Sequence, residues 1–255
     1  MNKNKNIKKT QTEKAYKNLD FLNSKDARIV RILSEYLYPK AQFEEENIQN
    51  TIVIFGSARA PSPEDLGSQE GSNKNLKLAE YYDATRTLSK KLTEWSKSLN
   101  EEYQKYVICS GGGPGIMIAA NRGASEAEGK NSALRISLPF ENIPNPYVSP
   151  ELDFEFHYFF TRKFWFSYLA KALIIMPGGF GTLDEFFEIL TLIQTGKIKK
   201  KMPIVLFGEE YWNKLINFET LVEFGTINRE DLDLFFLTSN VDEAYEYIVS
   251  NLSSK

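Results

Sequence analysis

One run of the sequence, Ile174-Ile175-Met176-Pro177-Gly178-Gly179-Phe180-Gly181-Thr182-Leu183-Asp184-Glu185, joins three local patterns. The apolar segment that ends at Met176 predicts a buried parallel strand, and Pro177 ends it. Three glycines follow, and Thr182 then opens a segment with apolar residues at helical spacing: Leu183, Phe186, Phe187, Leu190 and Ile193. A strand, a glycine turn and a helix point backbone N–H groups and a positive helix end at an anion. The run therefore predicts half of a site for a nucleotide phosphate.

The same alternation of strands and helices continues on both sides of this run. Apolar and β-branched segments predict further strands at 51–55, 106–109, 132–138, 154–160, 203–207 and 234–237. Helical spacing predicts helices at 24–37, 78–95, 116–128, 161–169, 211–224 and 241–252, with Pro39 ending or bending the first and a loop at 60–75. The expected fold class is α/β, a Rossmann-like, doubly wound and mainly parallel sheet with helices on both faces. Gly56, Gly111–Gly115 and Gly178–Gly181 follow three strands, so these turns should meet in one crevice.

Length and composition set limits on the class of protein. The 255 residues are enough for one large domain at 25–255, preceded by a flexible lysine-rich arm at 1–24. The net charge of −3 indicates no general affinity for nucleic acid or membranes. One cysteine, Cys109, excludes an internal disulfide, and one histidine, His157, excludes a multi-histidine metal site, so we expect neither metal nor cofactor. With no apolar run of transmembrane length and no signal-peptide pattern, we expect a cytoplasmic protein.

Two common nucleotide motifs are absent from the glycine turns. The dinucleotide pattern G-x-G-x-x-G requires glycine where Ile116 and Asp184 stand. The P-loop also fails, because Gly129-Lys130 and Gly196-Lys197 lack both the upstream glycine and the following hydroxyl. The residues alone therefore favour a mononucleotide or sugar-phosphate site.

Three motifs together resemble one known family. Pro177 to Glu185 is similar to the P-G-G-x-G-T-x-x-E signature of the LOG family, the Rossmann-like cytokinin riboside 5′-monophosphate phosphoribohydrolases long mislabelled as lysine decarboxylases. Ser110 to Met117 and the pair Arg162-Lys163 resemble further motifs of that family, in the same order. The resemblance covers about 51–224, and the N-terminal extension is similar to the longer bacterial branch.

The resemblance implies cleavage of a nucleoside 5′-monophosphate, of the AMP or cytokinin-riboside type, into free base and ribose 5-phosphate. Arg162 and Glu185 take the positions of the family's critical arginine and glutamate. The phosphate would be held by the glycine loops through Gly112, Gly113, Gly178, Gly179, Gly181 and Thr182. Further substrate contacts are expected from Ser57, Arg59, Lys163 and Asp184. The family's habit also implies a homodimer or a higher homo-oligomer.

Each of these residues has a plainer structural alternative. Thr182 and Glu185 have the spacing of a capping box, in which Glu185 would accept from the Thr182 amide. The pair Arg162-Lys163 begins a predicted helix, where cations are disfavoured, so it would bind phosphate or pair with Glu185 or Asp184. Ile189 and Leu192 lie on the same helix face as Glu185, away from the main apolar stripe, so a second subunit could cover them.

Other functions remain open at this point. A protein of the same fold could sense a nucleotide without cleaving it, although the presence of both Arg162 and Glu185 favours an enzyme. A phosphotransfer or nucleotide-sugar enzyme would be expected to need a metal, and the only compact carboxylate cluster is Asp184, Glu185 and Glu188. Lysine decarboxylation is disfavoured, because the Ser-x-His-Lys type of pyridoxal phosphate lysine is missing and His157 is followed by Tyr158.

Overall fold

The computed structural model describes residues 12–66, 73–99, 102–138 and 144–253, and it contains one seven-stranded sheet. The strand order is β4-β3-β2-β1-β5-β6-β7, and each adjacent pair is parallel, which confirms the predicted fold class. The strands are β1 (Thr51–Phe55), β2 (Val107–Ser110), β3 (Asn131–Ile136), β4 (Asp153–Phe156), β5 (Ala170–Ile175), β6 (Ile204–Phe207) and β7 (Phe236–Thr238). All residues of β1, β2 and β6 are buried, as expected for strands covered on both faces.

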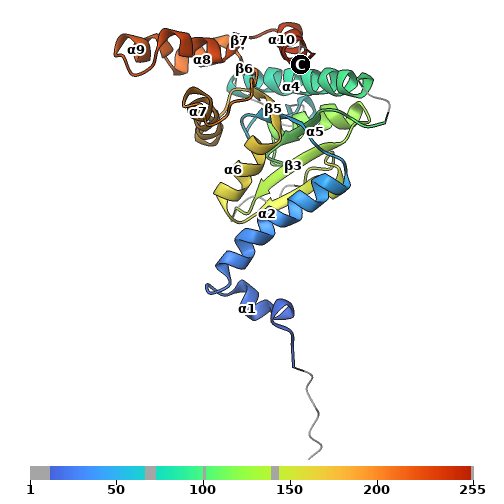
Figure 1. Ribbon diagram of the computed structural model, residues 1–255. Coiled ribbons are helices and arrows are strands. Elements are labelled where there is room, and N and C mark those ends of the chain that lie inside the picture. Colours follow the sequence, from blue (N-terminus) through green and yellow to red (C-terminus); the bar gives the residue numbers. More distant parts are fainter. Residues whose placement is uncertain (1–11, 67–72, 100–101, 139–143, 254–255) are drawn as a thin grey trace, which may run out of the picture.

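Helices cover both faces of the sheet and make two separate cores (Figure 1). One core contains side chains from α2 (Arg28–Glu45), α6 (Phe159–Tyr168), α7 (Phe180–Gln194) and α8 (Glu209–Leu215). The other contains side chains from α4 (Asn73–Ser98), α5 (Ile116–Glu126) and α10 (Val241–Ser253). No helix in the described ranges is both long and apolar enough to cross a membrane.

The strand order reverses at β1, which has β2 on one side and β5 on the other. Backbone hydrogen bonds join the turns that follow these three strands. Ser57 N–H donates to the Pro177 carbonyl at 3.0 Å, and Ile116 N–H donates to the Ser57 carbonyl at 3.0 Å. The turn after β1 is therefore bonded to both glycine loops, and the predicted crevice lies at this switch point.

The N-terminal region is more ordered than the sequence predicts. Within the expected arm, a 3-10 turn η1 (Ala15–Lys17) and a helix α1 (Leu19–Asn23) form, while residues 1–11 lie outside the described part. The next helix, α2, begins at Arg28 with Ala27 as N-cap, later than the predicted start at residue 24. It also continues through Pro39 to Glu45, and α1 and the start of α2 extend away from the sheet (Figure 1).

Several other boundaries differ from the predicted ones. The strand expected at 154–160 ends at Phe156, and α6 begins at Phe159. The helix expected at 211–224 is two helices, α8 and α9 (Phe218–Glu223). The loop expected at 60–75 holds a short helix, α3 (Pro63–Leu66), and the first turn of α4. Two 3-10 turns, η2 (Pro150–Leu152) and η3 (Arg229–Leu234), precede β4 and β7.

Candidate active site

A cleft of about 1070 Å³ opens at the carboxyl ends of β1, β2 and β5. Its walls come from the three turns after these strands, from α6 and from the start of α7. Of the residues predicted for the site, those that line the cleft are Ser57, Arg59, Gly113, Arg162, Gly178, Gly179, Gly181, Thr182 and Glu185. The structure thus brings most of the predicted residues to one place.

The start of α7 is open toward this cleft. Gly179 is the N-cap of α7, and no side chain caps the helix, so the first N–H groups are left for another acceptor. A Cβ atom added at Gly179 or at Gly181 would meet nothing within 4 Å. Packing therefore does not require glycine at these two positions, and the lack of a side chain leaves the backbone open at this end of the helix.

The start of α5 forms a second helix end at the same cleft, with the Ile116 N–H bonded to the Ser57 carbonyl and no side-chain cap. Its N-cap, Gly115, has φ of 67° and no capping side chain. A Cβ at Gly115 would lie 2.3 Å from the Ser57 carbonyl oxygen, so the close approach of two turns requires glycine here. Gly112 is different, because it is buried, has φ of 72° and does not line the cleft. A Cβ on it would meet Ala133 and Arg135 at 2.8 Å, so packing requires glycine here, and its predicted contact with phosphate lacks support from its placement.

Glu185 lies near the start of α7 and is almost completely buried, at 4% exposure. Its Oε1 has no hydrogen-bond partner among the described residues. Burial raises the pKa of Glu185 to about 7, against the opposing effect of Arg162 and Lys163. A carboxyl group with this pKa can exist in both protonation states near neutral pH.

Arg162 faces Glu185 from α6. One of its terminal nitrogens, Nη2, lies 3.7 Å from Glu185 Oε1, which is an ion-pair distance but longer than a normal hydrogen bond. The guanidinium carbon lies 5.2 Å from the centre of the Phe159 ring and 5.5 Å from that of Phe166. These two rings orient the cation, and the side chain is only 14% exposed.

Lys163 and Asp184 form an ion pair with each other, which was the structural alternative to a substrate contact. Lys163 Nζ lies 2.8 Å from Asp184 Oδ2 and 2.6 Å from Glu188 Oε2, and neither Lys163 nor Asp184 lines the cleft. Their predicted substrate contacts therefore lack support from placement. Because α6 begins at Phe159, both Arg162 and Lys163 lie later in the helix than predicted, so the helix dipole opposes them less.

The structure rejects the capping-box alternative for α7 and corrects the predicted apolar face of this helix. The capping box does not form, because α7 begins at Phe180 and Thr182 is already inside the helix. The apolar face was also misassigned: Ile189 is buried in the core beside Phe186, and Leu192 packs against the same core. Phe187, expected in the core, is 39% exposed. No second subunit is needed to cover Ile189 and Leu192.

The sequence pattern did not identify a charged wall beside the first glycine loop. Arg135, Asp153 and Glu155 line the cleft from β3 and β4. Ser110, the last residue of β2, pairs with Ala133, so β3 and β4 continue three residues beyond it. The alternation of side chains in β3 could have indicated that Arg135 faces away from the core that holds Leu134. The charged wall exists because β3 and β4 extend beyond the end of β2, and the sequence does not predict strand lengths to this accuracy.

Other reactive groups lie apart from this chemistry. Among the described residues, no group of three or more His, Cys, Asp or Glu side chains is placed to hold a metal ion. Cys109 is buried in β2 as predicted, and burial raises the pKa of its thiol to about 12. His157 is exposed.

Comparisons with known proteins agree with the geometry. A family model described as possible lysine decarboxylase matches residues 117–248, about half of the chain. A probable cytokinin riboside 5′-monophosphate phosphoribohydrolase, LOG4 of Oryza sativa subsp. japonica, is 36% identical over 83 residues, 32% of this chain and 36% of the relative. A cytokinin riboside 5′-monophosphate phosphoribohydrolase of Rhodococcoides fascians is 37% identical over 62 residues, 24% of this chain and 31% of the relative.

These matches are partial, and the chain spans about a third of the length of the curated relatives it matches. A solved structure extends the likeness of fold. The X-ray structure of TM1055 has a TM-score of 0.50 and 19% sequence identity, and the match covers 79% of this chain and 99% of that one.

Proposed function

The chain belongs to the LOG family, whose model is described as possible lysine decarboxylase, and from this we propose that it hydrolyses the N-glycosidic bond of a nucleoside 5′-monophosphate. The substrate would be AMP or a cytokinin riboside monophosphate, and the products a free base and ribose 5-phosphate. The observation that carries the proposal is the buried Glu185, with Oε1 facing Arg162 at 3.7 Å in a cleft between two uncapped helix ends.

The phosphate would bind between the two glycine loops. The uncapped N-termini of α5 and α7 supply N–H donors and the positive ends of two helix dipoles. Gly178, Gly179 and Gly181 line this part of the cleft together with Thr182, and Gly113 faces them from the other loop. Ser57 and Arg59, which follow β1 and line the same cleft, would add contacts to this ligand.

Glu185 would act at the bond that breaks. Cleavage of a C1′–N bond passes through a state with positive charge at C1′, as in glycoside hydrolysis. The ionised carboxylate of Glu185 would stabilise this charge and orient the attacking water. Water adds to C1′, the electron pair of the C1′–N bond leaves with the base, and the proton lost by the water ends on the base.

Arg162 would complete the site. Its positive charge lowers the pKa of Glu185 and so opposes the effect of burial on that carboxyl. Because the two side chains are 3.7 Å apart, a ribose or phosphate oxygen could accept from the guanidinium without first breaking a short hydrogen bond to Glu185.

The test is incubation of the protein with AMP, other nucleoside 5′-monophosphates and a cytokinin riboside monophosphate. We expect free base and ribose 5-phosphate in equal amounts from at least one of them, detected by chromatography. Adenosine is the matched control, because it lacks the phosphate that the glycine loops would hold, and it should remain intact. Binding of a monophosphate without release of base would support a nucleotide sensor instead and reject hydrolysis.

We also propose that the protein is a homodimer or a higher homo-oligomer. The support is a set of exposed apolar side chains on two neighbouring helices: Leu33 and Leu37 of α2, and Phe160, Phe164 and Tyr168 of α6. Tyr36 and Phe164 join the two helices, with ring centres 5.4 Å apart. Light scattering should give at least twice the chain mass of 29.3 kDa, and a monomeric mass would contradict this proposal.

A further inference from the structure

The helix that carries Arg162 is held at its start by a residue far away in the sequence. The N-cap of α6, Tyr158, makes no capping hydrogen bond with its side chain. Glu35 of α2 instead binds the backbone N–H groups of the two residues that precede α6. Its Oε1 accepts from the His157 N–H at 2.7 Å, and its Oε2 accepts from the Tyr158 N–H at 3.3 Å.

The same carboxylate also reaches the first turn of α6. The Thr161 hydroxyl lies 2.5 Å from Glu35 Oε2 and 2.8 Å from the Tyr158 carbonyl, and its single proton can serve one of these acceptors at a time. A carboxylate near a helix N-terminus is stabilised by the free N–H groups and by the helix dipole. Thr161 directly precedes Arg162, so this contact lies one residue from the arginine.

The backbone of Glu35 makes a further bond to α6 because of Pro39. A proline has no N–H, so Pro39 cannot donate to the carbonyl four residues earlier, which is that of Glu35. The Trp165 Nε1–H donates to this carbonyl at 3.1 Å. Trp165 is buried, and its ring lies 5.4 Å from that of Phe43 of α2. Both the start and the middle of α6 are therefore fixed by α2.

We propose that Glu35 is a positioning residue for Arg162. It holds the first turn of α6 so that the guanidinium stays between Phe159 and Phe166 and faces Glu185. The inference rests on the proposed hydrolysis for its functional meaning. It also assigns a role to α2, which lies outside residues 117–248 that match the family model.

The pH dependence of the reaction can separate positioning from simple loss of structure. The charged side chains that act on Glu185 are Arg162 and Lys163 from α6, and Asp184 and Glu188 from its own helix. The other charged or titratable groups that line the cleft are Arg59, Arg135, Asp153, Glu155 and Tyr211. If Arg162 moves away, Glu185 loses its main opposite charge, and the rise of the rate with pH shifts to higher pH.

The experiment compares Glu35→Ala with Glu44→Gln in the full chain, using whichever monophosphate the wild type cleaves. Glu44 lies on the same helix and pairs with Lys40 on the surface, so it is a matched control. We expect Glu35→Ala to lower kcat/KM about 10- to 100-fold, as for a misplaced catalytic group. We also expect the increase of kcat/KM with pH to occur at a pH higher by as much as about 1 unit in Glu35→Ala. Glu44→Gln should change neither kcat/KM nor its pH dependence.

A second variant and a second measurement complete the test. Glu35→Gln keeps one carbonyl acceptor and the side-chain length, so its loss should be intermediate, and it replaces Glu35→Ala if that variant does not fold. Unchanged kinetics in these variants, or lost activity without a shift of the pH profile, would overturn the positioning role. Amide hydrogen exchange at 157–162 should become faster in Glu35→Ala. If the wild type cleaves nothing, the proposed function fails, and the exchange rates alone decide whether Glu35 holds α6.

Discussion

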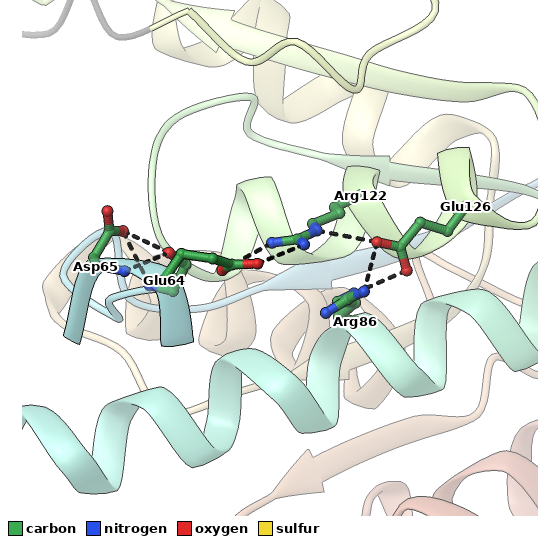
Figure 2. A network of polar contacts seen from close by, with 6 residues as sticks. Glu64, Asp65, Arg86, Arg122 and Glu126 are labelled. Carbon is green, nitrogen blue, oxygen red and sulfur yellow. Dashed lines mark hydrogen bonds and ion pairs between the residues drawn. The ribbon is translucent and has the colours of Figure 1, made fainter. Parts of the chain in front are cut away.

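Arg122 and Arg162 each face glutamates, but their surroundings differ. Arg122 binds both carboxylate oxygens of Glu64, at 2.7 and 3.1 Å, and its Nε donates to Glu126 at 3.0 Å (Figure 2). Arg86 binds the other oxygen of Glu126 at 2.8 Å. This network joins α3, α4 and α5, and its hydrogen bonds to Arg122 lower the pKa of Glu64 to about 2.

The pair of Arg162 and Glu185 has the opposite properties. The distance is 3.7 Å, Glu185 is buried, and burial raises its pKa to about 7. A buried carboxylate oxygen without a hydrogen-bond partner, as at Glu185 Oε1, lowers stability, whereas the hydrogen bonds around Arg122 outweigh the cost of burying Glu126. The same residue types thus form short hydrogen bonds in one place, whereas in the other they leave Glu185 Oε1 without a hydrogen-bond partner among the described residues. Geometry separates the two cases where residue type does not.

The largest effect should follow a change at Glu185. Glu185→Gln keeps the size of the side chain but cannot become negative, so it should lower kcat by about 10²- to 10⁴-fold. Glu126→Gln is the matched control, because it removes a carboxylate that pairs with arginine outside the cleft, and it should keep kcat within about twofold. Single-turnover rates measure the activity of both variants, and circular dichroism checks that they fold. Equal activities would contradict a catalytic role that belongs to Glu185 and not to Glu126.

The next effect concerns the two arginines. Arg162→Lys should lower kcat/KM by about 10- to 100-fold, because a lysine cannot fill the planar space between Phe159 and Phe166. Arg122→Lys should leave kcat/KM nearly unchanged and lower the melting temperature, because it removes the two-point contact with Glu64. Steady-state kinetics and thermal melts of the two variants give the comparison. A larger kinetic loss at Arg122 would contradict it.

Stability should respond to pH with opposite signs in the two clusters. The folded-state pKa of Glu185 lies above its unfolded value of 4.5, so wild-type stability is lost as pH rises from about 4.5 to 7. Glu185→Gln avoids this loss, and its gain in unfolding free energy should be about 2 kcal/mol larger at pH 8 than at pH 5.

Glu126 provides the opposite case. Burial tends to raise its pKa, but the hydrogen bonds of Arg86 and Arg122 outweigh this and lower it. Glu126→Gln should therefore destabilise the protein above the unfolded pKa of 4.5, and the loss should disappear as pH falls through the lowered folded-state pKa. Urea unfolding of both variants and the wild type at several pH values gives the change in unfolding free energy caused by each substitution as a function of pH. If this change varied with pH in the same direction for both variants, the two clusters would not differ in this way.

The smallest effect is expected at the glycines. Gly181→Ala should keep stability or add up to about 1 kcal/mol, because the new methyl group meets no neighbour and alanine favours a helix. Its KM for the monophosphate should rise about 3- to 10-fold, because the methyl group occupies space in the cleft. Gly112→Ala should instead lower stability, because of its φ of 72° and the 2.8 Å contact with Ala133. An unchanged KM in Gly181→Ala would argue against phosphate at this loop.

Local sequence patterns are enough to predict the fold class and the convergence of the glycine turns. The apolar run to Met176 and the β-branched run from Thr51 predict β5 and β1, and strands that alternate with helices predict the parallel sheet. Helix ends were less predictable. Thr182 resembles an N-cap in the sequence, but α7 begins two residues earlier, at Phe180, with Gly179 as its N-cap.

What the sequence could not give depends on contacts between distant segments. Residue type and motif indicate Glu185 and Arg162, yet the 3.7 Å distance and the raised pKa follow only from packing α6 against α7. Phe187 fits the predicted apolar stripe and Ile189 lies off it, yet Ile189 is the buried one, because burial depends on the rotation of α7 over the sheet. Glu35 stands in a helix with ordinary spacing, and no local signal connects it with His157, 122 residues later.

Pro39 also bears on how this protein could be recombined with its relatives. Pro39 leaves the Glu35 carbonyl of α2 without a helical donor, and the indole N–H of Trp165 on α6 donates to it. This hydrogen bond links two distant parts of the chain. A hybrid that joined residues 51–255 to the first helix of another protein would therefore need both a carboxylate at the position of Glu35 and a free carbonyl beside Trp165. A hybrid protein should therefore take α2 and α6 from the same parent.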